Sequence, residues 1–258
     1  MRRRRWQLGR LIERSVLGDH HEAALGRRRA IAKVSPVDAS DDDFARFANE
    51  VDLLTQAAGT GLIEVLAAGR QHDRLFFVTP RLDRYPSIEG ARAARHVLSD
   101  VGSALGRLHR LGAAHRDVRP ETIWWDGSRP RLGQLGLAMR PVAADRTGGT
   151  GPLGAVPFLD PEVVRGRPAD AASDLWALGV TAHVLACGRH VFDGLLAHDL
   201  GGALDRIATD EPRIDPRIDP ALQWAIARCL APRAERPRDG RALVSAIEEM
   251  GARSCAAS

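Results

Sequence analysis

The sequence predicts an α+β fold of two lobes, a small lobe rich in β-strands followed by a larger helical lobe. Two observations predict this order: short apolar runs crowd the first third of the chain, and helical stripes of apolar residues fill the rest. A length of 258 residues, 44% of them hydrophobic, suits one globular unit or two closely packed lobes. We expect a lobe of residues 1–83 and a lobe of residues 84–258, joined as one domain.

Three apolar runs in the first third predict strands, at residues 28–34, 62–67 and 75–79. Between the first two, Ser40 precedes three aspartates, which predicts a helix start because acids are favoured in a first helical turn. The helix carries a stripe of Phe44, Phe47, Val51 and Leu54, spaced three and four apart.

Glu50 falls on the same face as this apolar stripe. An acid on the inward side of a helix is costly unless a cation meets it, and Lys33 lies on the strand just before. We therefore expect Glu50 to pair with Lys33, with a glutamate that reaches solvent at the edge of the stripe as the alternative.

Four further stripes predict the helices of the large lobe. One carries Val97, Val101, Leu105 and Leu108, and the others span 175–187, ended by Gly188, then 222–230 and 243–250.

The composition excludes several classes of protein. The longest apolar stretch without charge is shorter than the roughly 18 to 20 residues of a membrane span, and the basic start is not followed by a signal-peptide core, so we expect a cytoplasmic protein. The three cysteines are too few and too far apart for a disulfide framework or a CxxC zinc site. The net charge is +4, but the arginines are scattered among acids, which argues against a nucleic-acid partner.

Arginine supplies almost all the basic residues: of 37 Lys+Arg, only Lys33 is a lysine. An ammonium is a compact point charge, whereas a guanidinium is larger and planar, so a site that needs the former does not accept the latter. A chain that uses arginine almost everywhere thus kept one lysine.

Short motifs occur in order along the chain. They are Ala30-Ile31-Ala32-Lys33, His115-Arg116-Asp117-Val118-Arg119-Pro120-Glu121-Thr122, Asp160-Pro161-Glu162, Ser173-Asp174-Leu175-Trp176-Ala177-Leu178-Gly179 and Glu235-Arg236-Pro237. In this order and spacing they resemble the motifs of the eukaryotic-like, bacterial-type Ser/Thr protein kinases. The resemblance runs through almost the whole chain and implies the two-lobed kinase fold.

The resemblance implies roles for three catalytic residues. Lys33 would contact the inner phosphates of ATP and pair with Glu50, and Asp117 would orient and deprotonate the acceptor hydroxyl. Arg119 stands where a lysine usually steadies the transferred phosphate. A merely structural carboxylate is the alternative for Asp117.

The resemblance also implies a nucleotide site. Gly18 is the surviving glycine of the glycine-rich loop when it is placed first in the pattern, with His20 and Ala23 at the other glycine positions. His20 and His21 are then expected to be exposed loop residues. Pro80 would offer a carbonyl acceptor to the base and Leu82 an N–H donor.

Two metal positions depart from the family pattern. Gln134 replaces the carboxylate expected to hold magnesium, and Thr122 replaces the asparagine that is the other protein ligand. Magnesium prefers hard, anionic oxygen ligands, so these positions argue against a firmly held Mg²⁺ or Mn²⁺. With about 3 kcal/mol for each lost group, a usual rate of about 1 to 100 per second would fall by roughly four powers of ten.

Three further expectations concern the second half of the chain. Asp174 is expected to brace the catalytic loop, and Glu162 to form a buried ion pair with Arg236. Ala155 replaces a threonine that bridges the catalytic residues in the family. Arg116 is a candidate partner for a phosphate on Thr147 or Thr150, and a flexible glycine-rich loop is the alternative there.

We therefore predict a pseudokinase that keeps the nucleotide cleft, with ATP as the ligand that the resemblance implies, and acts as a regulatory or scaffolding module on a protein partner. The alternatives are a divergent active Ser/Thr kinase that transfers the ATP γ-phosphate to a protein hydroxyl, and a small-molecule phosphotransferase of related fold.

Overall fold

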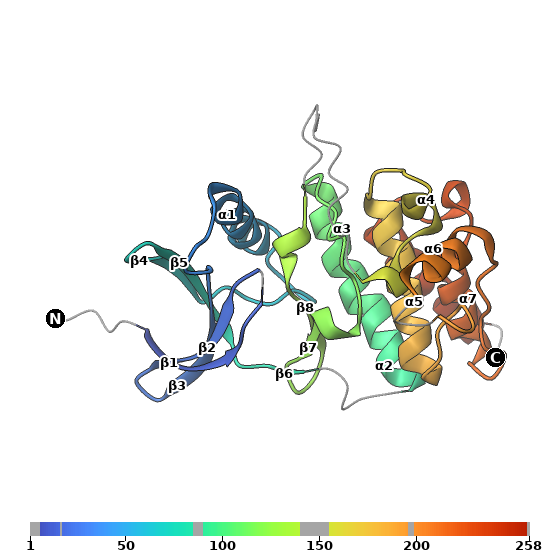
Figure 1. Ribbon diagram of the computed structural model, residues 1–258. Helices are drawn as coiled ribbons and strands as arrows, with labels where there is room; N and C mark the ends of the chain where they lie inside the picture. The colour runs from blue at the N-terminus through green and yellow to red at the C-terminus, as the bar shows by residue number, and fades with distance from the viewer. Residues whose placement is uncertain (1–5, 16, 85–89, 140–154, 196–198, 257–258) are drawn as a thin grey trace.

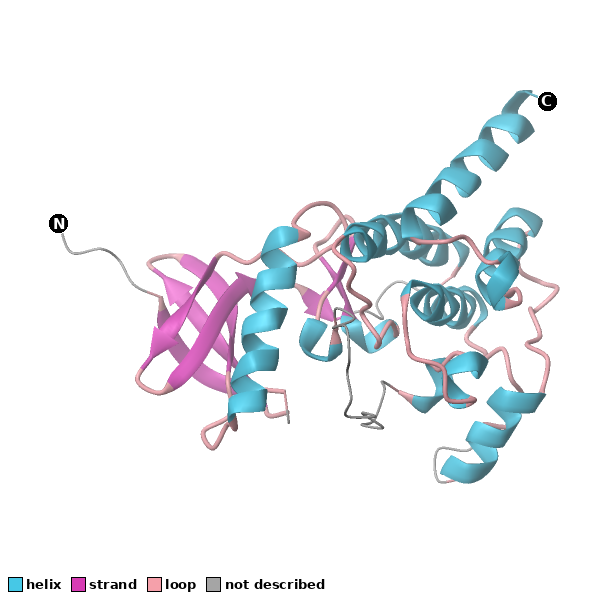
Figure 2. Ribbon diagram, turned by 90° about the horizontal axis from the view of Figure 1, so that it is seen from above, coloured by secondary structure: helices cyan, strands magenta, loops and turns pink. Residues whose placement is uncertain are grey.

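The computed structural model describes residues 6–15, 17–84, 90–139, 155–195 and 199–256 and has two lobes (Figure 1). Five strands of the small lobe form one antiparallel sheet in the order β1-β2-β3-β5-β4. A single helix, α1 (Asp41–Gln56), packs beside this sheet on the side toward the large lobe (Figure 2). The strands are β1 (Gln7–Glu13), β2 (Asp19–Leu25), β3 (Arg28–Val34), β4 (Ala67–Gln71) and β5 (Arg74–Pro80).

Helix α1 begins where the sequence predicts. The Ser40 hydroxyl accepts from the Asp43 N–H at 3.2 Å, and the Asp43 carboxylate accepts from the Ser40 N–H at 3.0 Å, which satisfies two otherwise unpaired donors. Hydrogen bonds from the Ser40 side chain and backbone lower the pKa of Asp43. The buried face carries Phe47, Leu53 and Leu54, and Glu50 lies among them.

The predicted strand at 62–67 is wrong. The Ile63 N–H donates to the Leu132 carbonyl at 3.0 Å and the side chain of Leu62 is buried, so the start of this apolar run packs toward the large lobe. The strand β4 begins only at Ala67 and is mostly exposed. Strands β1 and β2, which the sequence reading did not predict, mostly lack clean alternation of buried and exposed residues.

The large lobe is mainly helical, which together with the sheet of the small lobe confirms the predicted α+β class. Its helices are α2 (Ala91–His96), α3 (Gly102–Arg110), α4 (Pro161–Val164), α5 (Ala171–Cys187), α6 (Leu200–Thr209), α7 (Pro220–Leu230) and α8 (Gly240–Ala256). A π-helical turn, Val97–Val101, joins α2 to α3, so the predicted stripe from Val97 to Leu108 lies on one continuous segment. As predicted, α5 ends at Gly188, whose φ of 69° is left-handed.

A short three-stranded sheet borders the large lobe where the two lobes meet. It contains β6 (Asp83–Arg84), β7 (Ile123–Trp125) and β8 (Pro130–Leu132) in that order. The loop after α1 is fixed to α3, because Arg107 donates to the carbonyl of Ala57 at 2.8 Å and to that of Thr60. This contact sets the position of α1, and therefore of Glu50, relative to the large lobe.

Candidate functional site

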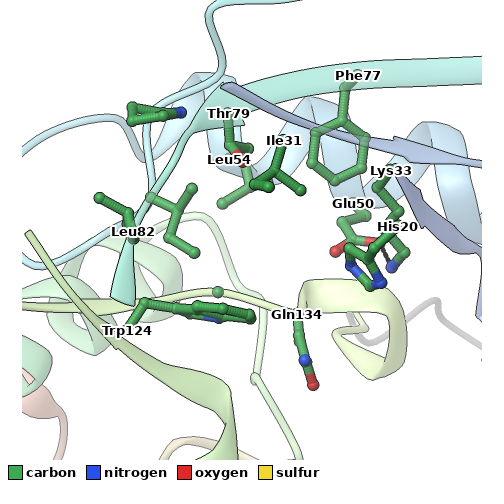
Figure 3. Close-up of a pocket in the computed structure, with 13 residues that line it drawn as sticks. His20, Ile31, Lys33, Glu50, Leu54, Phe77, Thr79, Leu82, Trp124 and Gln134 are labelled. Atoms are coloured by element: carbon green, nitrogen blue, oxygen red, sulfur yellow. Dashed lines mark hydrogen bonds and ion pairs between the residues drawn. The ribbon is translucent and has the colours of Figure 1, made fainter. Parts of the chain in front are cut away.

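A cavity of about 510 Å³ lies where the small lobe faces β7 and the segment after β8 (Figure 3). This volume includes open space at the mouth of the cavity. Five of the predicted site residues line it: Lys33, Glu50, Pro80, Leu82 and Gln134. These residues are far apart in the sequence, from Lys33 to Gln134. They lie on β3, on α1, at the end of β5 and just beyond it, and in the segment after β8.

The predicted pair of Lys33 and Glu50 is formed. The Lys33 Nζ lies 2.6 Å from Glu50 Oε2, and the two side chains are only 4% and 2% exposed. The rings of Phe47 and Phe77 lie with their centroids 5.8 and 6.0 Å from the ammonium. The glutamate on the apolar face of α1 is therefore neutralised inside the lobe, as the sequence analysis expected.

One end of the cavity is apolar and aromatic. Ile31 and Leu54 line it from the small lobe, and the flat indole of Trp124 lies across the opposite side, below Leu82 (Figure 3). The sequence reading missed Trp124 as a site residue. Its position two residues after Thr122, at the end of the catalytic-loop motif, was a signal that could have found it.

The catalytic loop is held by Asp174. Its carboxylate accepts from the backbone N–H groups of His115 and Arg116 at 2.7 and 2.8 Å and contacts His109 Nε2 at 3.0 Å. This is the bracing that the sequence analysis expected from Asp174. It fixes the backbone immediately before Asp117.

Asp117 and Arg119 contact each other. The Asp117 Oδ1 accepts from Arg119 Nε at 2.9 Å and from the Ala155 N–H at 3.3 Å. Arg119 Nη1 also donates to Glu121 at 3.0 Å. Neither Asp117 nor Arg119 is among the residues that line the cavity with Lys33.

The two predicted metal positions do not fit magnesium. Thr122 is fully buried, and its hydroxyl lies 2.9 Å from the carbonyl oxygens of both Asp117 and Arg119 and accepts from the Arg119 N–H at 3.2 Å. Gln134 contributes only a neutral amide. Among the residues that the structure describes, no three His, Cys, Asp or Glu side chains form a cluster suited to a metal ion. The Thr122 hydroxyl and the Gln134 amide are not the anionic oxygens that Mg²⁺ prefers.

The predicted placement of the glycine-rich loop is wrong. Strand β2 begins at Asp19, so Gly18 ends the β1–β2 loop, and His20 and Ala23 lie within the strand. At the end of the loop, Gly18 takes the last glycine position of the pattern G-x-G-x-x-G. Glu13 and Ser15 then stand at the first two glycine positions. A single glycine cannot fix the register of a three-glycine pattern.

Gly18 and His20 also lie elsewhere than expected. Gly18 does not line the cavity but packs on Lys33, since a Cβ at Gly18 would lie 3.2 Å from Lys33 Cε. His20, expected to be exposed, lines the cavity beside Lys33 (Figure 3).

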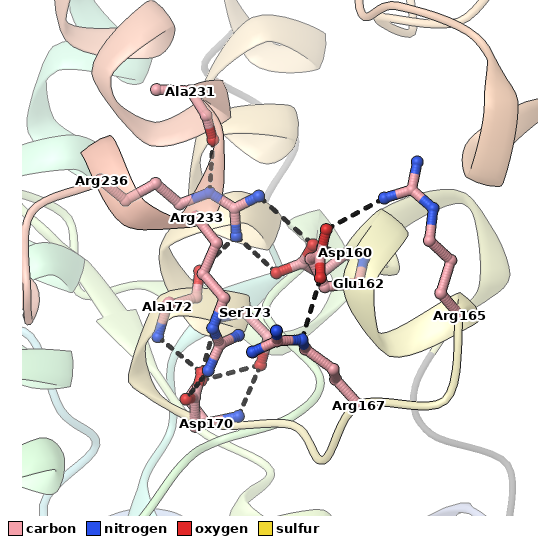
Figure 4. Close-up of polar contacts among 10 residues, drawn as sticks. All are labelled: Asp160, Glu162, Arg165, Arg167, Asp170, Ala172, Ser173, Ala231, Arg233 and Arg236. Atoms are coloured by element: carbon pink, nitrogen blue, oxygen red, sulfur yellow. Dashed lines mark hydrogen bonds and ion pairs between the residues drawn. The ribbon is translucent and has the colours of Figure 1, made fainter.

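The predicted pair of Glu162 with Arg236 is also wrong (Figure 4). Arg236 binds Asp160, with Nη1 at 2.5 Å from Oδ2 and Nη2 at 3.3 Å from Oδ1. Glu162 instead meets Arg165 and Arg167 at 3.0 and 3.1 Å. Asp160 is the buried N-cap residue of α4 and faces inward, whereas Glu162 on the first turn is partly exposed.

Comparison of the sequence with known protein families identifies the fold. The protein kinase domain family matches residues 19–235, which is most of the chain. The chain belongs to the protein kinase family, of the bacterial Ser/Thr type.

Three curated relatives are Ser/Thr kinases of bacteria. The chain is 34% identical over 186 residues to the serine/threonine-protein kinase PknL of Mycobacterium tuberculosis, covering 68% of this chain and 46% of the relative. It is 33% identical over 243 residues to the DNA damage-responsive serine/threonine-protein kinase RqkA of Deinococcus radiodurans, covering 86% and 35%. It is 29% identical over 215 residues to the probable serine/threonine-protein kinase PknB of Bifidobacterium longum, covering 74% and 31%. The chain thus spans less than half the length of each of these relatives.

Membership implies that the cavity between the lobes is the family's ATP site, and that the family's substrates are proteins. Within the described ranges, no helix has both the length and the hydropathy needed to cross a bilayer. Thr147 and Thr150, the candidate phosphorylation sites, lie outside the described residues.

Proposed function

We propose that this chain is a pseudokinase, a kinase-fold module that regulates or scaffolds a protein partner without efficient phosphoryl transfer. The chemistry of the two metal positions carries this proposal. Phosphoryl transfer depends on metal ions that bridge the phosphates and neutralise the charge that develops there. Gln134 and the buried, internally bonded hydroxyl of Thr122 do not supply that anionic site.

The paired Lys33 and Glu50 support a cleft that is still used. A buried ion pair contributes little to net stability, because desolvation offsets most of the attraction. Its presence next to a cavity in an otherwise arginine-rich chain supports a role in holding a ligand, or in fixing the two lobes relative to each other. Either role would let the module switch the surface that it offers to a partner.

One observation favours a second candidate, a divergent active Ser/Thr kinase. Asp117 and Arg119 are adjacent and braced by Asp174, in the arrangement that would orient a substrate hydroxyl. In that case the metal would need a ligand other than Gln134 and Thr122. A small-molecule phosphotransferase is less well supported, because the curated relatives named above are protein kinases.

A phosphate-transfer assay tests the proposal. The chain is incubated with γ-labelled ATP, a generic protein substrate and either Mg²⁺ or Mn²⁺, beside Lys33→Met and the double variant Gln134→Asp with Thr122→Asn. We expect wild type to match Lys33→Met, and the double variant to exceed both if the metal positions are the limiting defect. Metal-dependent transfer by wild type that Lys33→Met abolishes would establish the active kinase instead.

The same assay with a purified partner would measure regulation. The partner is first captured from the native host with the chain as bait and then tested in pure form. The cytoplasmic location stays a prediction.

A further inference from the structure

One end of the small-lobe sheet carries a group of exposed arginines, which we call the arginine rim. Its members come from β1, from the turn between β2 and β3 with the start of β3, and from the segment after β5. The turn between β2 and β3 lies on the side of the small lobe away from the large lobe (Figure 1), so this end of the sheet is open to a large ligand. The rim consists of Arg10, Arg27, Arg28, Arg29 and Arg81.

The strand register places two of these arginines across from each other. Ala30 on β3 pairs with Pro80 on the antiparallel β5. Arg29 comes just before Ala30 and Arg81 just after Pro80, so the two arginines face each other at the next position of the same register. Like charges at opposite positions of neighbouring strands are destabilising. An anion placed between Arg29 and Arg81 would remove this repulsion.

The rim holds one acid, which two arginines share. Glu22 on β2 lies 3.6 Å from Arg10 and 3.8 Å from Arg81, and such long contacts between exposed side chains neutralise charge only in part. Within the described part of the chain, the residues from Arg27 to Arg29 form no ion pair. The next acid along the chain from Arg81 is Asp83. The rim therefore carries a surplus of positive charge.

Exposed arginines of the large lobe show a closer match of charges. Arg95 lies 2.7 Å from Asp219, and Arg217 lies 2.5 Å from Asp215. Each of these arginines has an acid of its own, whereas Arg10 and Arg81 share one. A surface with unmatched charge raises the local concentration of partners of opposite sign and speeds their association.

A carboxylate suits the rim, because Glu22 already lies between two of its guanidinium groups. The planar fork of arginine matches a carboxylate with two parallel hydrogen bonds. The rim itself has no aromatic ring on which a nucleic-acid base could stack, and the neighbouring Trp6 packs against a buried cluster of the sheet. On β1, the large apolar side chains that are exposed are Leu8 and Ile12, which are less than the continuous apolar face by which proteins lie on a bilayer.

We propose that the arginine rim docks an acidic segment of the protein partner, rich in Asp and Glu, with carboxylates placed between Arg29 and Arg81. This inference rests on the proposed function, because it names the chemistry of the partner that the module binds. Arg81 stands between Pro80 and Leu82, which both line the main cavity. A segment docked at the rim therefore lies at the edge of the cleft.

Fluorescence polarisation of a labelled octaglutamate peptide tests the docking with the full chain. We expect saturable binding at low ionic strength that weakens as salt is added, since exposed charges are screened. A labelled octalysine peptide should not bind. Absence of octaglutamate binding at low salt overturns the proposal, as does equal binding of octalysine.

A double charge reversal locates the site. Arg29→Glu with Arg81→Glu should weaken octaglutamate binding at least about tenfold, because like charges are then opposed across the interface. The matched control is Arg92→Glu with Arg189→Glu, two exposed arginines of the large lobe, which changes the net charge equally. Thermal melts check that both variants fold. Equal losses of affinity in the two folded variants would mean that only net charge matters and would refute the rim.

A variant of the opposite sign sharpens the test. Glu22→Gln removes the acid that Arg10 and Arg81 share and should strengthen octaglutamate binding about threefold. The control is Asp73→Asn, which removes an equal charge from the turn before β5, at the other end of that strand from Arg81. An unchanged affinity in Glu22→Gln, or an equal gain in Asp73→Asn, contradicts the proposed position of the carboxylates.

Other polyanions are the competing ligands. Phosphatidylserine vesicles and a single-stranded oligonucleotide are titrated at the same total negative charge as octaglutamate. Weaker binding of both supports a protein segment. Tighter binding of either, lost in Arg29→Glu with Arg81→Glu, would assign the rim to a bilayer surface or to nucleic acid and overturn the proposal.

Failure of this inference and failure of the proposed function give different results. If octaglutamate does not bind and the labelled-phosphate assay shows no transfer, the rim alone is refuted. Metal-dependent transfer overturns the pseudokinase, whatever the affinity for octaglutamate.

Discussion

Two buried ion pairs, Lys33 with Glu50 in the small lobe and Arg236 with Asp160 in the large lobe, are satisfied in different ways. Arg236 contacts both carboxylate oxygens of Asp160, donates to the carbonyls of Ala231 and Ala172 at 2.7 and 3.1 Å, and lies 5.0 Å from the centroid of the Trp176 ring. Within the described part of the chain, Lys33 makes one hydrogen bond, to Glu50, beside a cavity.

The difference separates a structural pair from one available to a ligand. All three guanidinium nitrogens of Arg236 are held by named partners, so this pair ties α4, α5 and the segment before α8 together. An ammonium has three donors, and among the residues that the structure describes Lys33 uses one of them, toward Glu50. A pair that is less completely bonded and borders a cavity can exchange partners when the cavity is filled.

Removal of the structural pair should have the largest effect. Arg236→Ala leaves Asp160 buried without its cation, and we expect a loss of about 3–5 kcal/mol in the free energy of unfolding. Urea denaturation measures this. Arg238→Ala, two residues on and exposed, should stay within about 0.5 kcal/mol of wild type. A small loss in Arg236→Ala would remove the distinction between the two pairs.

Removal of Lys33 should cost less. Lys33→Met leaves the Glu50 carboxylate without its partner, but the adjacent cavity gives water a path to it, so we expect a loss of about 1–3 kcal/mol. Adding Glu50→Leu should recover most of this, because a well-packed apolar pair replaces a buried ion pair at little net cost. The same denaturation experiment applies, and a loss equal to that of Arg236→Ala would contradict the comparison.

Weakening the helix that carries Glu50 gives a smaller effect. Ser40→Ala removes the N-cap of α1, and we expect a loss of about 1 kcal/mol. Thr55→Ala on the same helix is the control, since its hydroxyl bonds only to the Val51 carbonyl one turn back. Hydrogen exchange along α1 should rise in the first variant and not in the second.

The smallest effect depends on pH and concerns the large lobe. Burial lowers the pKa of His183 and of His190, and one ring nitrogen of each accepts a backbone N–H, from Asp215 at 3.0 Å and from Phe192 at 3.1 Å. The folded state therefore binds fewer protons than the unfolded chain, whose histidine pKa is about 6.5, so stability falls as the pH falls below that value.

Melting temperatures at pH 7.5 and 5.5 check this dependence. The double variant His183→Gln with His190→Gln should show a smaller drop on acidification than wild type. His72→Gln, in an exposed turn, is the control and should leave the drop unchanged. If the melting temperature of the double variant fell as much as that of wild type, these two histidines would not be the source of the pH dependence.

The sequence predicted best where one residue had a single physical solution. Glu50 on an apolar helix face is costly without a buried cation, and Lys33 lies on the strand just before, so the pair was expected over a glutamate that reaches solvent. Ser40 before three acids fixed the start of α1 in the same way. The family motifs then supplied the two-lobed fold.

The wrong predictions arose where several partners or registers had similar local patterns. Asp160 and Glu162 are two residues apart, and only the packing of α4 shows that Asp160 faces Arg236. The run at 62–67 is apolar because Leu62 faces the large lobe and Leu66 packs on the sheet of the small lobe, which a strand pattern does not reveal. Gly18 could be placed at any of three positions of the glycine pattern, and one glycine does not choose among them.

The single buried lysine has a practical consequence for chemical labelling. A reagent that acylates lysine amines can modify one side chain in this sequence, and that amine is 4% exposed in the closed cleft. No other lysine contributes background signal. The fraction of Lys33 that is acylated over time, measured in a digest, therefore reports how often the cleft opens. Carriers coupled through surface lysines would find none on this chain, and arginine-directed or thiol-directed chemistry is the suitable route for attaching probes.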